Sequence, residues 1–354
     1  MNIVAPGGVI GVLGGGQLGR MLALAAARLG LRAHIYSDEV DAPAFQVTAL
    51  KTLARYDDEA ALAKFADGCD AITFEFENIP AATIQFLSAR KPVAPDARAL
   101  GLTQDRLAEK NFVISLGLQT APFHAVDNGD DARMAFAKLN GAGILKTRRF
   151  GYDGKGQAKV TSADEAARAT EKFGAPCILE GLVDFSFEAS VIAARGRDGG
   201  FAAFDVPENI HENHILRRST VPSPLSPAQE QQAKIIARKI AEALDYVGVL
   251  AVELFVGKDG ALLVNEIAPR VHNSGHWTIE ACTCSQFEQH IRAVAGWPLG
   301  DPARHADAVM ENIIGAEADA WESLSRSGAL HLYGKGETRM GRKMGHVTRL
   351  SPRK

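Results

Sequence analysis

The stretch that most constrains the fold covers residues 249–276 and has the pattern of a β-hairpin. Two apolar segments rich in Val and Leu flank a four-residue turn that contains two glycines, as expected for antiparallel strands. Pairing of Val256 with Ala261 across the turn would make Glu253 and Glu266 diagonal neighbours on one face. Their Cβ atoms would then lie roughly 7–8 Å apart.

Two glutamates on one face of an apolar hairpin are costly to bury unless a cation meets them. Mg²⁺ or Mn²⁺ suits such a pair, because hard divalent ions take oxygen ligands and keep water or phosphate oxygens as well. Asn265 falls on the other face in this register. Each glutamate alone also fits a solvated strand face, so the hypothesis of a metal site at Glu253 and Glu266 rests on the pair and on the polar run after it.

Composition excludes several classes of protein. The 354 residues carry 39 Lys and Arg against 42 Asp and Glu, a net charge of −3, so no basic surface predicts a nucleic-acid partner. The four scattered cysteines include no Cys-x-x-Cys pair, which favours a reduced, cytoplasmic protein. We find no secretory signal and no apolar stretch long enough to span a membrane.

The N-terminal segment predicts the first unit of a doubly wound sheet. A short apolar strand at 9–13 leads into Gly14, Gly16 and Gly19 of a G-x-G-x-x-G turn, and a helix-forming segment follows. The turn is compatible with a dinucleotide, with another phosphate, or with close packing of helix on strand. Strands are expected at 32–36 and, as the third of the sheet, at 71–76, where Glu75 lies near the carboxyl end that binds ligands in such sheets.

A second glycine-rich loop follows the strand predicted at 143–146, which ends in Lys146. Residues 151–157 hold three glycines and Lys155, so backbone N–H groups and an ammonium are available for phosphate oxygens. The spacing is not that of a Walker A loop, and a flexible hairpin turn is the alternative.

The remaining pattern alternates strands and helices. We expect strands at 177–183 and 185–194, a polar loop at 207–211 that carries His211, and helices at 227–244 and 278–295. Ser226 is the expected N-cap of the first helix, with Gln229 at N3. Short strands around 312–315 and 329–333 precede a basic tail, which is either a solvated face or a site for a substrate phosphate.

These motifs together resemble the ATP-grasp superfamily and, within it, the 5-(carboxyamino)imidazole ribonucleotide synthases of purine biosynthesis. The resemblance extends over almost the whole chain, and Val271 stands where the family usually has proline. Its motifs are GGGQLGRM at 14–21, TFEFEN at 73–78, YDGKGQ at 152–157, NEIAPR at 265–270, HNSGH at 272–276 and YGK at 333–335.

The resemblance implies an α/β ATP-grasp fold with a Rossmann-like pre-ATP-grasp domain and a small C-terminal β-rich domain. The boundaries we expect are 1–105, 106–298 and 299–354. The implied reaction is that of a carbon–nitrogen ligase, in which ATP, bicarbonate and 5-aminoimidazole ribonucleotide give the N-carboxylated ribonucleotide, ADP and phosphate by way of carboxyphosphate. The resemblance also suggests a homodimer.

The resemblance further implies roles for individual residues. ATP would be bound by Arg106, Lys146, Gly151, Tyr152, Asp153, Gly154, Lys155, Gly156, Gln157, Glu180, Gly181, Leu182, Val183, Glu188, His211, Asn265 and Glu266. The metal would be held by Glu253 and Glu266. Bicarbonate and the intermediate would meet Arg270, His272 and Asn273, with Tyr152 and Asp153 placing the amine. The ribonucleotide would contact Gln17, Leu18, Glu75, Lys335 and Arg342.

Three alternatives remain at this stage. The nearest is another ATP-grasp ligase, such as a formate-dependent glycinamide ribonucleotide transformylase. A nicotinamide-dependent dehydrogenase would use the glycine turn at 14–19 but leaves the glutamate pair unexplained. A nucleotide sensor without catalysis is the third, and it is disfavoured because the expected polar positions are filled.

Overall fold

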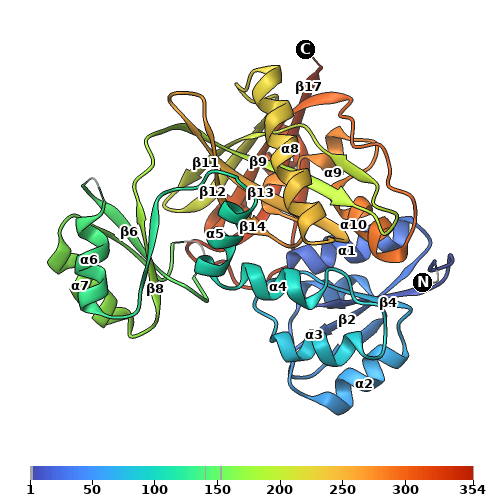
Figure 1. Ribbon diagram of the computed structural model, residues 1–354. Helices are drawn as coiled ribbons and strands as arrows, with labels where there is room; N and C mark the ends of the chain where they lie inside the picture. Colours follow the sequence, from blue (N-terminus) through green and yellow to red (C-terminus); the bar gives the residue numbers. More distant parts are fainter. Residues whose placement is uncertain (1–2, 140, 152–153, 354) are drawn as a thin grey trace.

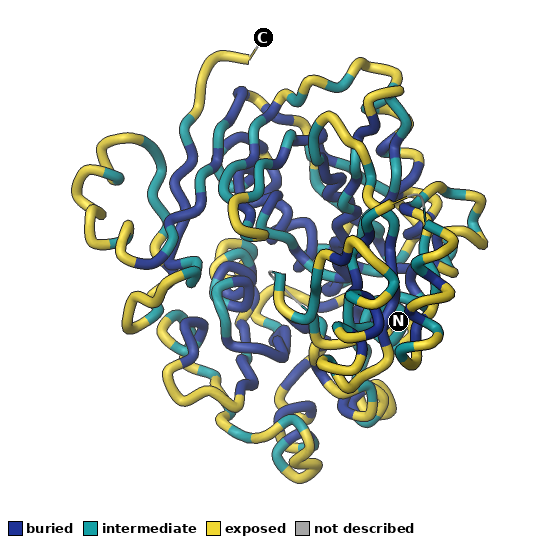
Figure 2. The backbone as a smooth tube through the Cα atoms, turned by 90° about the vertical axis from the view of Figure 1, so that its left-hand side faces the viewer, coloured by how far each residue is buried: buried dark blue, intermediate teal, exposed yellow. Residues whose placement is uncertain are grey.

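The computed structural model describes residues 3–139, 141–151 and 154–353 and contains three β-sheets. Figure 1 shows them as separate bodies, with the first domain (blue) below the largest sheet and the green segment set apart to one side. Figure 2 shows that the buried backbone lies in the interior and that exposed segments form the rim. Among the helices described, none combines the length and the apolar composition that a bilayer crossing requires.

The first sheet is parallel and has the strand order β3-β2-β1-β4. Its strands are β1 (Val9–Leu13), β2 (Arg32–Ser37), β3 (Leu50–Leu53) and β4 (Ala71–Phe74). The predicted strands at 9–13 and 32–36 are confirmed, but β3 was missed, so the segment near 71 is the fourth strand. Alternate residues of β3 are exposed, and a four-residue edge strand gives little apolar signal.

Helix α1 (Gln17–Arg28) begins directly after the glycine turn, as expected, and packs on the sheet. Helices α2 (Glu59–Asp67) and α3 (Ala81–Ser88) pack on each other and complete this domain. Strands β1 and β4 are both buried along their whole length, as expected for a parallel sheet that is covered on both faces. Gln17 and Glu75, which follow the carboxyl ends of these two strands, line one cleft of the molecule.

The second sheet belongs to a small domain that we call the lid. Its antiparallel strands have the order β5-β8-β6-β7. They are β5 (Phe123–Val126), β6 (Gly143–Thr147), β7 (Gln157–Val160) and β8 (Cys177–Gly181). Helices α6 (Gly129–Ala137) and α7 (Ala163–Phe173) cover one face (Figure 1), and their core is built from Val126, Ala132, Leu145 and Ala166.

The third sheet is antiparallel and forms the body of the molecule. It has the order β14-β13-β9-β11-β12-β15-β17-β16, and β10 pairs with β9. Its strands are β9 (Phe185–Arg195), β10 (Phe201–Ala203), β11 (Glu208–Glu212), β12 (Ile215–Val221), β13 (Gly248–Gly257), β14 (Leu262–Ala268), β15 (Ala306–Ile314), β16 (Ala329–Leu332) and β17 (Lys343–Pro352). The C-terminal strands thus continue the sheet that begins with the hairpin.

Alternation along β9 divides the core between the two faces of this sheet. Val191 and Ala193 pack with α8 (Pro227–Ala243), whereas Ile192 and Ala194 pack with α10 (Gln286–Ala295) and α1. Successive side chains of a strand point to opposite faces, so a strand covered on both sides is apolar throughout. The predicted Ser226–Gln229 capping box of α8 is confirmed.

Two sequence predictions about elements of this body are wrong. The segment predicted as a polar loop at 207–211 lies largely in β11, which pairs with β9 and β12. The segment predicted as one helix at 278–295 is two, α9 (Thr278–Ala281) and α10, because the Ser285 side chain accepts from the Glu288 N–H and caps a new helix. The cap pattern Ser-x-x-Glu was the available signal.

Candidate active site

A cleft of about 760 Å³ lies where the three sheets meet. Polar and charged side chains from the first domain, the lid and the hairpin line it together. The predicted site residues that line it are Gln17, Leu18, Glu75, Arg106, Lys146, Gly151, Gly154, Lys155, Gln157, Glu180, Gly181, Leu182, Val183, Glu188, His211, Glu253, Asn265, Glu266, Arg270, His272 and Asn273. Gly156, Lys335 and Arg342 are not in its lining, and Tyr152 and Asp153 lie outside the described residues.

The hairpin that carries the glutamate pair has a different register from the predicted one. Val256 pairs with Leu262, and Glu253 lies directly opposite Glu266 rather than diagonal to it. Two changes produce this register: the pairing beside the turn is shifted by one residue, and a bulge makes the ladder pass from Glu266 to Val264 and leaves Asn265 as the extra residue. A bulge turns its extra side chain out of the normal alternation, and Asn265 and Glu266 both line the cleft.

Each carboxylate of the pair has one partner in the cleft. His272 Nε2 lies 2.9 Å from Glu253 Oε1, and Arg106 Nη1 lies 3.2 Å from Glu266 Oε2. Burial alone would raise the pKa of Glu253, but the hydrogen bond from His272 outweighs burial and holds that pKa at about 2. Glu253 is therefore an anion at neutral pH.

The donor set of this pair fits a magnesium ion. Both side chains supply only oxygen and face one cleft, which is the chemistry that Mg²⁺ prefers. Among the residues described, no three His, Cys, Asp or Glu side chains already form a metal cluster. Two protein carboxylates would thus leave the remaining positions to water and phosphate, as is usual for Mg²⁺ bound with a nucleotide.

A second charged group joins the lid to the hairpin. Lys146 Nζ lies 2.9 Å from Glu180 Oε2, and Lys110 Nζ lies 3.6 Å from Glu180 Oε1. The Lys110 ammonium also donates to Thr120 Oγ1 at 2.9 Å and to the Asn265 carbonyl at 3.3 Å. Lys110 therefore ties α5 (Arg106–Ser115) to the backbone beside the bulge.

Lys110 was missed by the sequence analysis, as was Glu109. They follow Arg106 by four and three residues on α5, and residues at these spacings share one face of a helix. Glu109 Oε1 accepts from the Ile267 N–H at 2.6 Å. Burial and the nearby Glu266 charge raise the pKa of Glu109 to about 8. The helical spacing from Arg106 was the signal that could have found both.

The lid end of the cleft combines an apolar wall with a carboxylate. The Phe185 and Phe255 rings stack with centroids 4.8 Å apart, and Leu182 lies in the same lining. His211 Nδ1 contacts Glu188 Oε2 at 2.6 Å. Burial would lower the pKa of His211, but its bond to Glu188 outweighs burial and raises that pKa. A flat aromatic group with adjacent hydroxyls suits this arrangement.

The glycine turn of the first domain holds a carboxylate of its own chain. The Gly19 N–H donates to Glu75 Oε2 at 2.7 Å, and the Gly16 N–H donates to Glu75 Oε1. Gly14 has a φ of +105°, a conformation that favours glycine. Glu75 therefore satisfies two of the donors that the glycine pattern offered to a phosphate. Burial raises the pKa of Glu75, although the two N–H bonds oppose it.

Arg270 and Asn273 are each held by a residue of another element. Glu77 accepts from Arg270 Nη2 at 3.0 Å and also from Arg270 Nε. Asn273 Nδ2 donates to Asn312 Oδ1 at 3.0 Å, and Asn312 Nδ2 donates to Asn273 Oδ1 at 2.5 Å and to the Leu216 carbonyl at 2.8 Å. Asn312 was not predicted; Glu77 belongs to the predicted TFEFEN motif at the strand end, but its pairing with Arg270 was not expected.

Lys335 and Arg342 lie in the C-terminal domain beside Lys343, which does line the cleft. Lys335 Nζ donates to the Lys343 carbonyl at 2.8 Å, and Arg342 Nη1 donates to the Glu337 carbonyl at 3.2 Å. Burial, assisted by the charge of Arg342, lowers the pKa of Lys335 to about 8.

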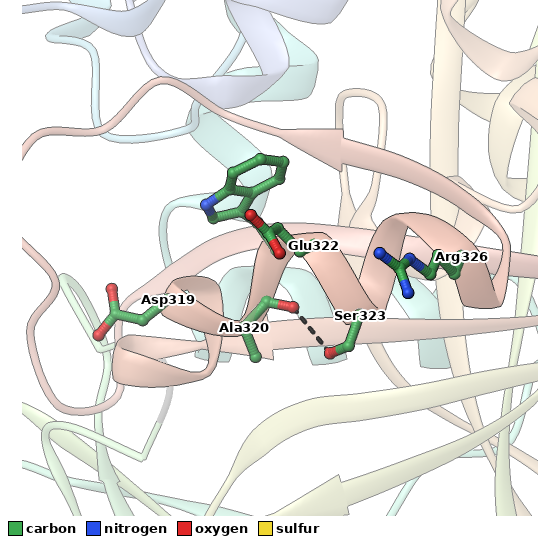
Figure 3. A pocket seen from close by; sticks show the side chains of 6 residues that line it. Asp319, Ala320, Glu322, Ser323 and Arg326 are labelled. Atoms are coloured by element: carbon green, nitrogen blue, oxygen red, sulfur yellow. Dashed lines mark hydrogen bonds between the residues drawn. The ribbon is translucent and has the colours of Figure 1, made fainter.

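A second hollow, of about 450 Å³, lies on one short surface segment. Figure 3 shows its lining, which comes only from residues 319–326 on and just before α11 (Trp321–Ser327), with the Ser323 hydroxyl bonded to the Ala320 carbonyl. Among the residues described, only the adjoining helices η3 (Gly315–Ala320) and α11 contribute to its lining. We therefore assign the chemistry to the large cleft.

Three family descriptions match consecutive parts of the chain. Residues 8–104 match the ribonucleotide synthetase preATP-grasp domain, 111–287 the ATP-grasp domain, and 308–354 the phosphoribosylaminoimidazole carboxylase C-terminal domain. Fold and cleft thus define an ATP-grasp enzyme. The chain is 52% identical over 98% of each chain to the N5-carboxyaminoimidazole ribonucleotide synthase of Brucella melitensis biotype 1. It belongs to the N5-carboxyaminoimidazole ribonucleotide synthase family.

Solved structures of the same family superpose on the chain. The ADP complex of one N5-carboxyaminoimidazole ribonucleotide synthetase has a TM-score of 0.95 at 41% identity and covers 99% of this chain and 94% of its own. The Aspergillus clavatus synthase, in complex with ADP and 5-aminoimidazole ribonucleotide, has a TM-score of 0.91 at 30% identity, covering 98% and 94%. The fold class predicted from the sequence is confirmed.

Proposed function

We propose that this chain carboxylates 5-aminoimidazole ribonucleotide with bicarbonate at the expense of ATP, in purine biosynthesis. The observation that carries the proposal is the composition of one cleft. A phosphate-binding set (Lys146, Lys155) and an anion-binding set (Arg270, Asn273) line it together with the Glu253–Glu266 pair. Family membership and the nucleotide complexes of the solved relatives support the same function.

Two transfers account for the products. A bicarbonate oxygen attacks the γ-phosphorus of ATP, and ADP leaves, which forms carboxyphosphate. The amine nitrogen of the ribonucleotide then attacks the carbon of carboxyphosphate; the carbon–oxygen bond breaks, phosphate leaves with that oxygen, and the nitrogen loses a proton. Both steps bring anions together, so positioning and charge compensation do most of the work.

The residues of the nucleotide end bind and orient ATP. Lys146 and Lys155 offset phosphate charge, the glycine loop supplies N–H donors, and Glu188 accepts from ribose hydroxyls. The backbone from Glu180 to Val183 meets the base beside the Phe185–Phe255 stack. Gly156, Tyr152 and Asp153 stay in the proposed loop. Glu253 and Glu266 are the proposed Mg²⁺ ligands, and the bound ion would neutralise phosphate charge.

The residues at the end of the cleft that holds Arg270 and Asn273 bind bicarbonate and the intermediate. Arg270 is fixed by Glu77 and Asn273 by Asn312, so both side chains, which line the cleft, are held in place before bicarbonate binds. His272 lies beside them. Glu75 and Gln17 are proposed to place the ribonucleotide, and Lys335 with Arg342 to bind its phosphate. A closed lid would keep water from carboxyphosphate.

The division into domains at 105/106 and 298/299, a homodimeric assembly and a cytoplasmic location are further parts of the proposal. Limited proteolysis of the purified chain tests the division into domains, and light scattering tests the homodimeric assembly.

A phosphate-release assay tests the function. With ATP, Mg²⁺, bicarbonate and aminoimidazole ribonucleotide together, we expect rapid release that falls when either bicarbonate or the ribonucleotide is omitted. Formate with glycinamide ribonucleotide is the matched control for the transformylase alternative. Release that depends on formate, or that ignores bicarbonate, would refute the proposal.

A further inference from the structure

A chain of buried hydrogen bonds connects the core of the large sheet with Glu253. Ser219 Oγ lies 2.7 Å from Asn209 Oδ1, Asn209 Nδ2 lies 2.9 Å from Ser190 Oγ, and Ser190 Oγ lies 2.7 Å from Ser274 Oγ. The last contact joins Ser274 Oγ to His272 Nδ1 at 2.8 Å. All four residues before the histidine are at most 5% exposed.

The inner end of this chain favours donation toward His272. Asn209 Oδ1 is the partner that the structure gives to the Ser219 hydroxyl within the residues described, so Ser219 donates and the amide oxygen faces it. The Asn209 amide nitrogen must then face Ser190 and donate to it. The bond from Asn209 leaves the Ser190 proton available for Ser274, and the Ser274 proton is then available for His272 Nδ1.

A second contact also makes His272 Nδ1 a hydrogen-bond acceptor. The backbone N–H of Ser274 points at Nδ1 at 3.4 Å, where the histidine caps the short helix η2 (Asn273–Gly275). An N–H group only donates, so Nδ1 is an acceptor for two groups. The ring proton therefore lies on Nε2, the atom that is 2.9 Å from Glu253 Oε1.

We propose that Ser219, Asn209, Ser190 and Ser274 are positioning residues that hold the proton of His272 on Nε2. His272 then donates to Glu253 and fixes the orientation of that carboxylate, as outer partners do for metal ligands. Because Nε2 is then bonded to Glu253, bicarbonate is bound by Arg270 and Asn273. The placement of the proton is independent of the proposed function, whereas the consequence for the metal rests on it.

Nitrogen NMR of the full, ¹⁵N-labelled chain without nucleotide tests the placement. His272→Gln identifies the His272 signals. We expect a pyridine-type Nδ1 and a pyrrole-type Nε2 in the unaltered protein, and both signals shifted toward their average in Ser274→Ala and Ser190→Ala. Ser226→Ala is the matched control, because it removes the cap of α8 and should leave the His272 signals unchanged. A protonated Nδ1 in the unaltered chain, or signals in Ser274→Ala identical to it, overturns the proposal.

A binding measurement tests the consequence without turnover. Mn²⁺ affinity in the presence of ADP, followed by electron paramagnetic resonance, is expected to fall about tenfold in Ser274→Ala and not in Ser226→Ala. Equal losses in both variants would reduce Ser274 to a structural role and overturn this part. If the NMR result holds but the chain does not carboxylate the ribonucleotide, the proposed function fails while the proton placement stands.

Discussion

Glu77 of the first domain holds Arg270 of the ATP-grasp domain through two parallel hydrogen bonds. Burial would raise the pKa of Glu77, but the charge and the bonds of Arg270 outweigh burial and keep that pKa at about 2. The pair is therefore ionised at any physiological pH. It links a strand end of one sheet to the segment after the hairpin and sets the plane of the guanidinium.

We predict that Glu77→Gln impairs the use of bicarbonate. Gln cannot accept both guanidinium bonds, and a misplaced anion-binding group costs roughly 100-fold in rate. We expect kcat/KM for bicarbonate to fall by about that factor, with KM for ATP nearly unchanged, in steady-state phosphate release. Asp57→Asn, which breaks the exposed Arg55–Asp57 pair, is the control. An equal fall in kcat/KM for ATP would show that the substitution disturbs the fold as a whole.

We predict that Glu266→Gln removes Mg²⁺-dependent turnover while the fold survives. The amide keeps the shape of the side chain but loses the charge that meets the cation, so we expect a loss of at least ~100-fold. Activity is measured across a Mg²⁺ titration, and circular dichroism monitors folding. Glu242→Gln on the exposed face of α8 is the control. Turnover like that of the unaltered chain would contradict a metal-binding role for Glu266.

We predict that the KM for the ribonucleotide depends on Lys335 and rises with pH. Its pKa of about 8 means that the ammonium is charged below pH 8 and neutral above it, so attraction to the substrate phosphate fades between pH 7 and pH 9. Lys335→Ala should show a high KM at every pH. Lys335→Arg should keep a low one, since arginine stays protonated. Equal changes in the KM for ATP would assign Lys335 another role.

We predict that Asn312→Ala frees Asn273 to rotate and lowers kcat/KM for bicarbonate about tenfold, the worth of roughly one hydrogen bond. Asn312 fixes the amide because its own Nδ2 also donates to the Leu216 carbonyl. A double-mutant cycle with Asn273→Ala makes the measurement specific. If Asn312 acts through Asn273, the double variant is no worse than Asn273→Ala; additive losses would exclude that mechanism.

Local pattern predicted the elements whose signal lies within a few residues. Strand β1, helix α1, the Ser226 cap and the existence of the hairpin all follow from apolar spacing and turn residues that are adjacent in the chain. The predicted site residues also include just over half of the cleft lining, and many of them lie at the end of a strand or in the loop after one. Ligand-binding residues occur at such positions in α/β folds.

Tertiary pairing decided what the sequence did not predict. The bulge at Asn265 changes the register of the hairpin, and its backbone is held by Lys110 from another element. Strand β11 forms because β9 and β12 pair with it. The partners of Arg270 and Asn273 lie 193 and 39 residues away, so no local pattern reports them.

The most direct test of the account follows oxygen from bicarbonate to phosphate. Freshly prepared ¹⁸O-bicarbonate is turned over with ATP and aminoimidazole ribonucleotide, and the released phosphate is analysed by mass spectrometry. If a bicarbonate oxygen attacks the γ-phosphorus, each phosphate carries one ¹⁸O atom. Unlabelled phosphate, formed at the same rate as ADP, would show that bicarbonate is not phosphorylated and would contradict the proposed mechanism.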